Sequence, residues 1–273
     1  MESAIENLVI EREAVLRLGF FAVIFIVMLI WELLAPRRVL TVSKLQRWGN
    51  NLGLLLLNSF VLRLLFPAAA VGIAYSVNEM GWGLFNWLAL PFWVEVVTAV
   101  LLLDLAIYLQ HLAMHRVPLL WRLHRVHHAD LDIDLTTGSR FHTIEIVVSM
   151  LIKWAVIALL GPALIAVLVF EILLNGMALF NHANVRLPRG VDRGLRTLLV
   201  TPDMHRVHHS ILRNETDSNF GFNLSLWDRA FGTYIDQPRL GHGGMTIGIP
   251  EFRDPHQVDR LPGMLGLPFI GKS

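Results

Sequence analysis

The stretch RLGFFAVIFIVMLIWELLAP, residues 17–36, decides the fold class of this chain. It has the length and apolar character of a helix that crosses a bilayer core, which is about 30 Å thick and takes roughly 20 residues. Similar stretches follow at residues 52–77, 91–110 and 146–181. Charged residues make up only 16% of the chain, whereas soluble domains carry about 25%. The sequence therefore predicts an all-α integral membrane bundle with about four membrane segments.

The last of these stretches, residues 146–181, is interrupted by Gly161 and Pro162. Each half is short for a full crossing, and a Gly-Pro pair favours a turn. We therefore expect a helical hairpin that dips into the membrane and returns to the side on which it started.

The positive charge of the short loops predicts the orientation, because Lys and Arg are enriched in cytoplasmic loops. The loop 36–51 carries Arg37, Arg38, Lys44 and Arg47, whereas the segment 78–87 has no Lys or Arg. We expect the N-terminus outside, the loop 36–51 in the cytoplasm, and the chain after residue 110 in the cytoplasm apart from the hairpin 146–181. The acidic residues that precede the first apolar stretch argue against a cleaved signal peptide.

Composition along the chain predicts three regions. Residues 1–90 form N-terminal transmembrane helices and loops, residues 91–235 form a membrane-embedded region that contains ten of the twelve histidines, and residues 236–273 form an irregular tail rich in Gly and Pro. The chain has no cysteine, which excludes disulfides, thiolate metal sites and cysteine nucleophiles. A net charge of +1 gives no support to nucleic-acid binding.

Ten of the twelve histidines lie between residues 111 and 209, and the pentad HRVHH occurs twice, starting at residues 124 and 205. Residues three and four apart share one face of a helix, so each pentad presents three imidazoles together, and HLAMH at 111–115 presents two more. Packing needs no such repeat, whereas metals bind clusters of neutral imidazoles. The predicted metal ligands are His111, His115, His124, His127, His128, His205, His208 and His209. Iron, copper, zinc and nickel all accept such ligands.

Further polar residues fall on the same predicted faces. Asp104 lies on the His111 face and is expected to accept an imidazole N–H or to line a polar cavity. His182 lies on a stripe with Glu171 and Asn175 and is a candidate ninth ligand. Glu145 follows His142 by about one helical turn. The two residues are expected to act as ligands or as partners of ligands.

Each pentad also contains an arginine, Arg125 or Arg206. We expect these either to pair with acidic residues around the site or to be solvated. The candidate acidic partners are Asp130, Asp203 and Asp228.

These motifs together resemble the fatty acid hydroxylase / sterol desaturase superfamily of membrane di-iron oxygenases. The resemblance is carried by HxxxH at 111–115, HxxHH at 124–128 and HxxHH at 205–209, and it extends over about residues 100–235. DLAIYLQHLAMH, RFHTIE, NHANVRLP and NFGFNLSLWDRAFGTY add to it. One departure is Thr143, which stands where the family usually has Pro.

The resemblance implies a di-iron centre held by the eight histidines of the three motifs, with no catalytic residue beyond the metal ligands. It also implies a four-helix membrane scaffold with a cytoplasmic helical cap that carries the histidines. Known members oxidise lipids with O₂ and an external electron donor. Because the chain has no GxGxxG motif, we expect a separate donor of the cytochrome b5 or ferredoxin type with its reductase.

The sequence thus predicts a lipid hydroxylase, whose substrate reaches the metals through an apolar slot between the helices that end near His111 and His182. A lipid desaturase with the same centre is the first alternative. A zinc-dependent membrane hydrolase, with Glu145 as its base, is the second. A metal transporter is less favoured, because transporters place ligands near the bilayer midplane.

Overall fold

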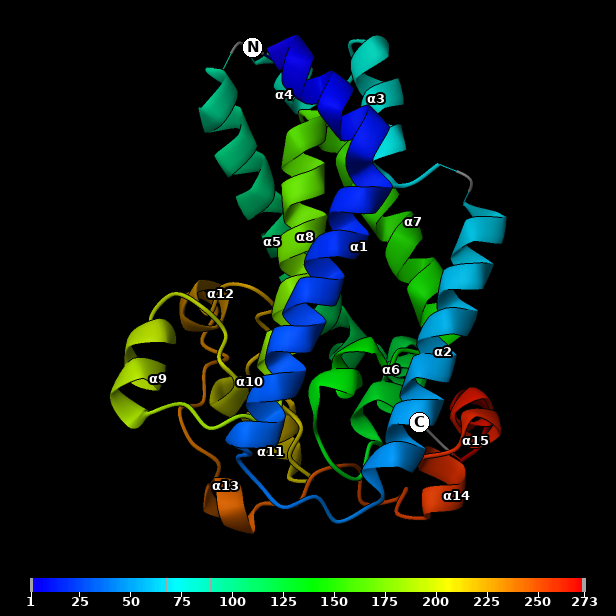
Figure 1. Cartoon of the computed structure of the whole chain (residues 1–273), viewed down its shortest axis with the longest axis vertical. Helices are drawn as coiled ribbons and strands as arrows, with labels where there is room; N and C mark the ends of the chain where they lie inside the picture. Colours follow the sequence, from blue (N-terminus) through cyan, green and yellow to red (C-terminus); the bar gives the residue numbers. More distant parts are fainter. Residues whose placement is uncertain (1, 67, 89, 272–273) are drawn as a thin grey trace.

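The computed structural model describes residues 2–66, 68–88 and 90–271, and within these ranges the chain is helical, with isolated bridges in place of strands. Figure 1 shows a bundle of long helices with a cap of short helices at one end. The bundle consists of α1 (Glu2–Leu34), α2 (Lys44–Leu65), α5 (Phe92–Arg116), α7 (Thr143–Leu160) and α8 (Leu164–His182). The predicted all-α bundle is confirmed.

Five helical stretches of the described residues are long and apolar enough to cross a membrane. Their outer faces expose large apolar side chains such as Leu18, Leu56, Phe60 and Leu159, each more than 65% exposed. Apolar patches of this size on a protein surface mark contact with lipid or with a partner. The exposed belt around the bundle is therefore the surface of an integral membrane protein.

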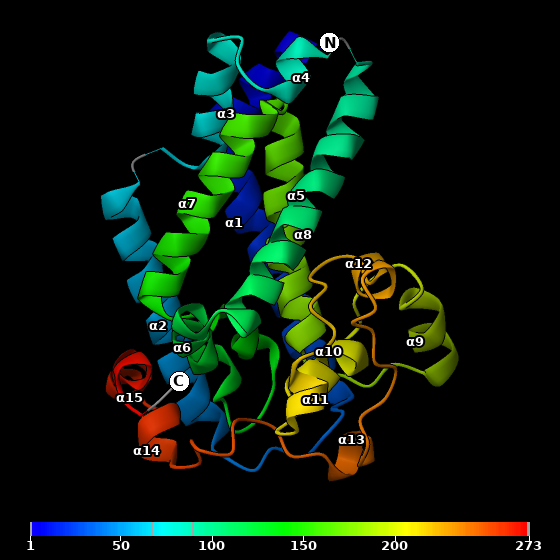
Figure 2. The same ribbon diagram turned by 180° about the vertical axis from the view of Figure 1, so that it is seen from behind.

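The stretch 146–181 differs in part from its prediction. It forms two antiparallel helices, α7 and α8, of 18 and 19 residues, and each is long enough to cross. The expectation that each half is short is wrong, because the flanking residues extend both helices. Gly161 makes the turn with φ of 57°, and a Cβ there would lie 2.4 Å from the carbonyl oxygen of Trp82. α7 runs away from the end of the bundle that carries the cap, and α8 returns to it (Figure 2).

The second predicted segment, residues 52–77, is not a single helix. α2 ends at Leu65, and two short helices follow, α3 (Ala70–Glu79) and α4 (Leu84–Trp87), at the opposite end of the bundle from the cap. Buried residues of α1, α3, α5, α7 and α8 form the largest apolar cluster of the described residues, which includes Val9, Ala74, Leu103, Ile157 and Val167. α1 and α8 approach closely, because Gly176 leaves room for the Ile24 side chain.

The cap contains the remaining helices. In chain order these are α6 (Pro118–His128), η1 (Leu135–Ser139), α9 (Arg189–Leu195), α10 (Pro202–His208), α11 (Arg213–Thr216), α12 (Leu226–Ala230), α13 (Gly241–Gly244), α14 (Pro255–Val258), α15 (Leu261–Gly266) and η2 (Leu267–Phe269). The described part of the predicted tail, residues 236–271, packs closely onto the cap. Met264 and Leu267 are fully buried with Leu54 and Val126. The Arg122 guanidinium donates to the carbonyl oxygen of Pro268 at 2.8 Å.

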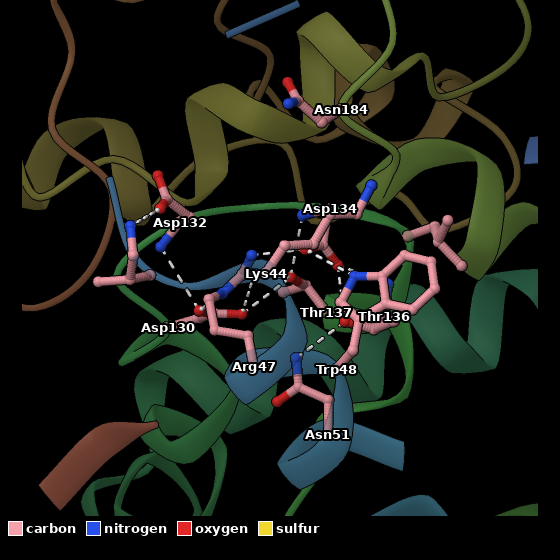
Figure 3. A network of polar contacts seen from close by, with 12 residues as sticks. Lys44, Arg47, Trp48, Asn51, Asp130, Asp132, Asp134, Thr136, Thr137 and Asn184 are labelled. Atoms are coloured by element: carbon pink, nitrogen blue, oxygen red, sulfur yellow. Dashed lines mark hydrogen bonds and ion pairs between the residues drawn. The ribbon is translucent and has the colours of Figure 1, made fainter. Parts of the chain in front are cut away.

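A buried polar network joins α2 to the loop between α6 and η1 (Figure 3). The Arg47 guanidinium donates two hydrogen bonds of 2.7 Å to the Asp130 carboxylate and one of 2.5 Å to Asp134. Its side chain and both carboxylates are fully buried. Burial alone would raise the pKa of Asp130, but the charges of Arg47 and Arg140 outweigh it and lower that pKa to about 2. The loop is therefore folded around Arg47, which the sequence treated only as a positive loop charge.

The same loop is held from two further sides. Asp132 accepts hydrogen bonds from the backbone N–H groups of Thr41 and Val42, at 2.6 and 3.0 Å. Asp134 accepts one from the N–H of Thr136 at 2.9 Å, which caps η1. The three alternating aspartates thus fix the segment that leads from the first pentad to the floor of the histidine site.

Candidate metal centre

Four helices, α5, α6, α8 and α10, supply the histidines of the site. His111 and His115 lie one turn apart at the end of α5. α6 begins with Pro118, which suits the first turn of a helix, and carries the first pentad on its last turns. α10 begins after Thr201, whose hydroxyl oxygen accepts from the N–H of Met204, and carries the second pentad. His182 is the last residue of α8.

Nine histidines form two groups, each of which could hold a metal ion, with ligand atoms that all lie within 4.8 Å of one another. The first histidine group contains His111, His115, His124, His128 and His208. The second histidine group contains His127, His182, His205 and His209. All nine are buried. Each pentad contributes to both groups, so the repeat does not correspond to one metal site per copy.

Hydrogen bonds of the outward-facing nitrogens fix the tautomer of several rings. The Nδ1–H of His111 donates to the carbonyl oxygen of Phe220 at 2.8 Å, and that of His208 donates to Ser218 at 2.7 Å. A carbonyl can only accept, so the proton of each neutral ring is on Nδ1 and the Nε2 lone pair points inward. These two Nε2 atoms lie 3.0 Å apart. Two lone pairs at that distance repel each other unless a cation lies between them.

The separations fit nitrogens that share an ion. Other Nε2 pairs lie 3.1 Å apart in the first group, between His115 and His128, and 3.0 Å apart in the second, between His182 and His205. Two nitrogens bound at about 2.1 Å and at right angles to each other lie about 3.0 Å apart. The residues present therefore fit a metal ion in each group.

The charge state of the cap histidines suits metal binding. Burial lowers the pKa of His127, His128, His205 and His209 well below 6.5, and neighbouring imidazoles lower it further. For His208 burial lowers the pKa to about 3. These rings are therefore neutral at physiological pH, as metal ligands must be.

Two carboxylates contact the rings from outside. Glu145 accepts a hydrogen bond of 2.6 Å from His124 Nδ1, as a partner of a ligand should. Asp217 lies 3.4 Å from His115 Nδ1, and the sequence analysis missed it, because nothing in the spacing of residue 217 relates it to residue 115.

Replacing Glu145 with alanine is expected to lower the affinity for a metal ion about 10- to 100-fold, because His124 loses the acceptor that orients its ring. Equilibrium competition with a chelator measures the effect. Glu145→Gln keeps an acceptor oxygen and should lie between the wild type and Glu145→Ala. An Ala variant with wild-type affinity would show that Glu145 does not position His124.

Four other predicted site residues lie outside the two groups. Asp104 accepts from the indole N–H of Trp227 at 2.9 Å and from the N–H of Leu224, so its predicted imidazole partner is wrong. His142 caps α7 and contacts the carbonyl oxygen of Leu265 at 3.3 Å. Asn175 lies in a cavity wall one turn from Glu171. Helical spacing gives the face of these side chains but not their distant partners.

Asp228 acts on the site only through the backbone. Its carboxylate accepts from the N–H of Phe220 at 2.7 Å and from that of Gly221 at 2.8 Å. The Phe220 carbonyl in turn accepts from His111. Asp228 thereby holds the strand-like segment that orients His111.

The pentad arginines are buried and tie each pentad to another segment. Arg125 donates to the carbonyl oxygen of Leu267 at 2.7 Å, which attaches α6 to the C-terminal segment. Arg206 pairs with Asp203 and donates to the carbonyl oxygen of Ala183 at 3.3 Å. Of the candidate partners from the sequence, Asp203 is therefore the one used by Arg206.

Gly138 in η1 lies directly under His182. A Cβ at this position would lie 2.4 Å from the carbonyl oxygen of Ala178 and 3.2 Å from His182 Nδ1. That carbonyl accepts the Nδ1–H of His182 at 2.8 Å. Only glycine leaves this hydrogen bond undisturbed.

The Gly138→Ala variant is therefore expected to lose stability by about 1–3 kcal/mol and to bind less metal than the wild type. Thermal unfolding and metal analysis of the purified protein check both effects. Gly190→Ala is the matched control, since a Cβ there meets nothing within 4 Å. Equal behaviour of the two variants would contradict the packing argument.

A cavity of about 310 Å³ opens beside the histidines and extends between α1, α2, α5, α7 and α8. His111, His124, His127 and His205 line one end of it. Apolar side chains such as Met114, Phe141, Leu174 and Leu179 line its walls. It lies where the slot was predicted, although three more helices than expected enclose it.

Comparison with known proteins finds relatives that are named as a lipid hydroxylase and as monooxygenases. An ornithine lipid hydroxylase of Rhizobium tropici is 30% identical over 55% of this chain and 44% of its own length. An alkylglycerol monooxygenase of Xenopus tropicalis is 30% identical over 86% of this chain and 51% of its own length, and the one from Homo sapiens is 32% identical over 57% and 34%. The chain thus spans about half the length of these relatives, or less. No solved structure matches it.

The profile of the family described as Fatty acid hydroxylase matches residues 96–233. This is slightly more than half of the chain, and it contains most of α5 and all of α6, α8 and α10, with all nine histidines of the two groups. The chain belongs to the fatty acid hydroxylase family.

Proposed function

We propose that this protein is a membrane-bound di-iron oxygenase that hydroxylates a lipid. The observation that carries the proposal is the pair of histidine groups, in which the inward Nε2 atoms of His111 and His208 lie 3.0 Å apart with their protons on the opposite nitrogens. The first histidine group would hold one iron and the second histidine group the other. His182 is then the ninth ligand.

Three features favour iron over zinc. Hydrolytic zinc sites use three protein ligands and a water in a tetrahedral arrangement, whereas the two groups offer five and four imidazoles. Tetrahedral ligands at about 2.1 Å would lie about 3.4 Å apart, further than the 3.0–3.1 Å found here. The relatives are named as a hydroxylase and monooxygenases.

The protein contributes position and environment. Bound iron supplies the redox chemistry with O₂ that breaks an unactivated C–H bond. The carbonyl oxygens of Phe220 and Ser218 keep His111 and His208 in the tautomer that binds metal. Glu145 orients His124, and the apolar walls of the cavity place a hydrocarbon chain beside the histidines and exclude water.

The balance of the reaction requires a partner. One atom of O₂ enters the substrate as a hydroxyl group and the other leaves as water, which consumes two electrons and two protons. A separate donor protein of the cytochrome b5 or ferredoxin type, with its reductase, would supply the electrons. We place the cap in the cytoplasm with this donor, on the evidence of the positive residues between 36 and 51, and we assign catalysis to residues 91–235.

Metal analysis and O₂ uptake of the detergent-purified protein test the proposal. We expect about two irons per chain, and O₂ consumption after reduction that is lost together with the iron in the double variant His127→Ala/His208→Ala. His256→Ala, which removes an exposed histidine, should retain both. Zinc without redox activity, in protein produced with ample iron, would overturn the proposal.

A further inference from the structure

The end of the cavity away from the histidines is charged. The Glu171 carboxylate on α8, whose side chain is 3% exposed, accepts from the Arg17 guanidinium on α1 at 2.8 Å and from the Lys153 ammonium on α7. All three residues line the cavity. We call them the polar cluster. Ionised side chains inside membrane helices are costly and mark functional sites, and the oxidation chemistry beside the histidines makes no use of these three.

The polar cluster lies at a defined distance from the histidines. Glu171 precedes His182 by eleven residues along α8, and Lys153 follows Glu145, which contacts His124, by eight residues along α7. A rise of 1.5 Å per residue places Glu171 about 16 Å and Lys153 about 12 Å from the histidine end. The walls between are mostly apolar, with Ile107 and Leu174 among the lining residues.

The polar cluster has more donors than its own acceptors use. A lysine ammonium has three N–H groups and an arginine guanidinium has five. Within the described residues, one donor of Lys153 contacts Glu171, and two donors of Arg17 contact Glu171 and Glu13. Arg17 and Lys153 line the cavity, so their remaining N–H groups can donate to an oxygen acceptor bound there.

This end of the cavity also leads towards a polar surface. The Arg17 side chain is 31% exposed, and the preceding turn of α1 exposes Glu11 and Arg12. A lipid head group can therefore reach the polar cluster from the end of the bundle opposite the cap, while its chain lies among the apolar walls.

We propose that Arg17 and Lys153 bind the carboxyl-derived oxygens of an acyl lipid, either a free carboxylate or an ester carbonyl, with the acyl chain extending towards the histidines. Glu171 holds the two cations in place. The consequence of this inference rests on the proposed oxygenase function. The oxidised carbon would lie about 12–16 Å from the head group, far along the chain and not next to the carbonyl.

Binding of radiolabelled palmitate, methyl palmitate and hexadecane to the purified full chain, without reductant so that no turnover occurs, tests the proposal. Arg17→Met and Lys153→Met should each weaken binding of palmitate about tenfold or more, since each removes a charged hydrogen bond, and leave hexadecane unchanged. Arg12→Met removes an exposed cation of the same helix and should change nothing. Lys153→Met/Glu171→Gln keeps the charge balanced and should still bind palmitate weakly.

Comparison of palmitate with methyl palmitate identifies the chemistry of the natural head group. Selective loss of palmitate binding indicates a free carboxylate, and equal loss of methyl palmitate binding indicates an ester carbonyl. Unchanged palmitate binding in both single variants, or hexadecane that binds the wild type as tightly as palmitate, would overturn the inference. If the cluster-dependent binding is present in protein without iron or O₂ uptake, the lipid site stands and the oxygenase proposal fails.

Discussion

The His182→Ala variant should retain about one iron per chain instead of two and should lose lipid oxidation by more than about a hundredfold. His182 Nε2 lies 3.1 Å from His127 Nε2 and 3.0 Å from His205 Nε2, so its loss leaves the second histidine group with three imidazoles. Removal of even an indirect partner of a ligand costs 10- to 100-fold in affinity or activity, and removal of a ligand costs more. Iron analysis and product quantification on the same preparation measure both effects.

His111→Ala is the companion variant, because it removes a ligand from the first histidine group and leaves His182 in place. It should also retain about one iron, in the second group. A His182→Ala variant that retains both irons and wild-type turnover would show that the centre has eight histidine ligands and that His182 only packs beside them.

Replacing Arg47 with methionine should destabilise the protein by about 3–5 kcal/mol, since it removes the guanidinium that the buried carboxylates of Asp130 and Asp134 both contact. Asp130 would keep only the more distant arginine, Arg140, at 3.9 Å. Both carboxylates are fully buried, so water cannot replace the guanidinium. The loop that they hold contains Gly138 under His182, and we therefore expect iron content to fall as well. Thermal unfolding in detergent and iron analysis measure the two effects.

Lys44→Met provides the control for Arg47→Met. Lys44 lies on the same helix and contacts Glu32 at 3.5 Å, with 32% of its side chain exposed. The Glu32 carboxylate is buried but also accepts from the N–H groups of Leu135 and Asn184. Loss of the partly exposed Lys44 is therefore expected to cost less, about 1 kcal/mol. Similar shifts of the unfolding temperature in the two variants would mean that the network around Arg47 contributes little to stability.

The sequence predicted those parts of the structure that depend on local pattern. Apolar runs located the long helices, and spacing of three and four residues placed the histidines of each motif on one face. It did not predict that each pentad is divided between the two histidine groups, because that division depends on the crossing of α6 and α10. His182 belongs to the second group, and its helical spacing from Glu171 and Asn175 had already indicated it as a candidate ligand.

The residues that were missed are those whose partners lie far along the chain. Arg47 was counted as a loop charge, yet its partners Asp130 and Asp134 lie more than 80 residues away and bury it completely. Asp104 was placed on the correct face but contacts Trp227. Arg37, Lys44 and Arg47 pair with carboxylates, and Arg38 donates to the carbonyl oxygen of His242. All four charges used for orientation therefore have structural partners, and the cytoplasmic position of the cap stays a prediction.

The unequal origin of the two histidine groups has a consequence for biosynthesis. Four members of the first group lie within the short span of residues 111–128, whereas the second group draws its members from residues 127–209. A nascent chain that has just completed α6 already holds most of the first group, but the second requires α8 and α10 to be made, inserted and docked. Because ion binding and folding are coupled, a protein that holds an ion in each group is expected to acquire them in order. The first ion can bind while the polypeptide is still emerging, and the second only after α10 has docked.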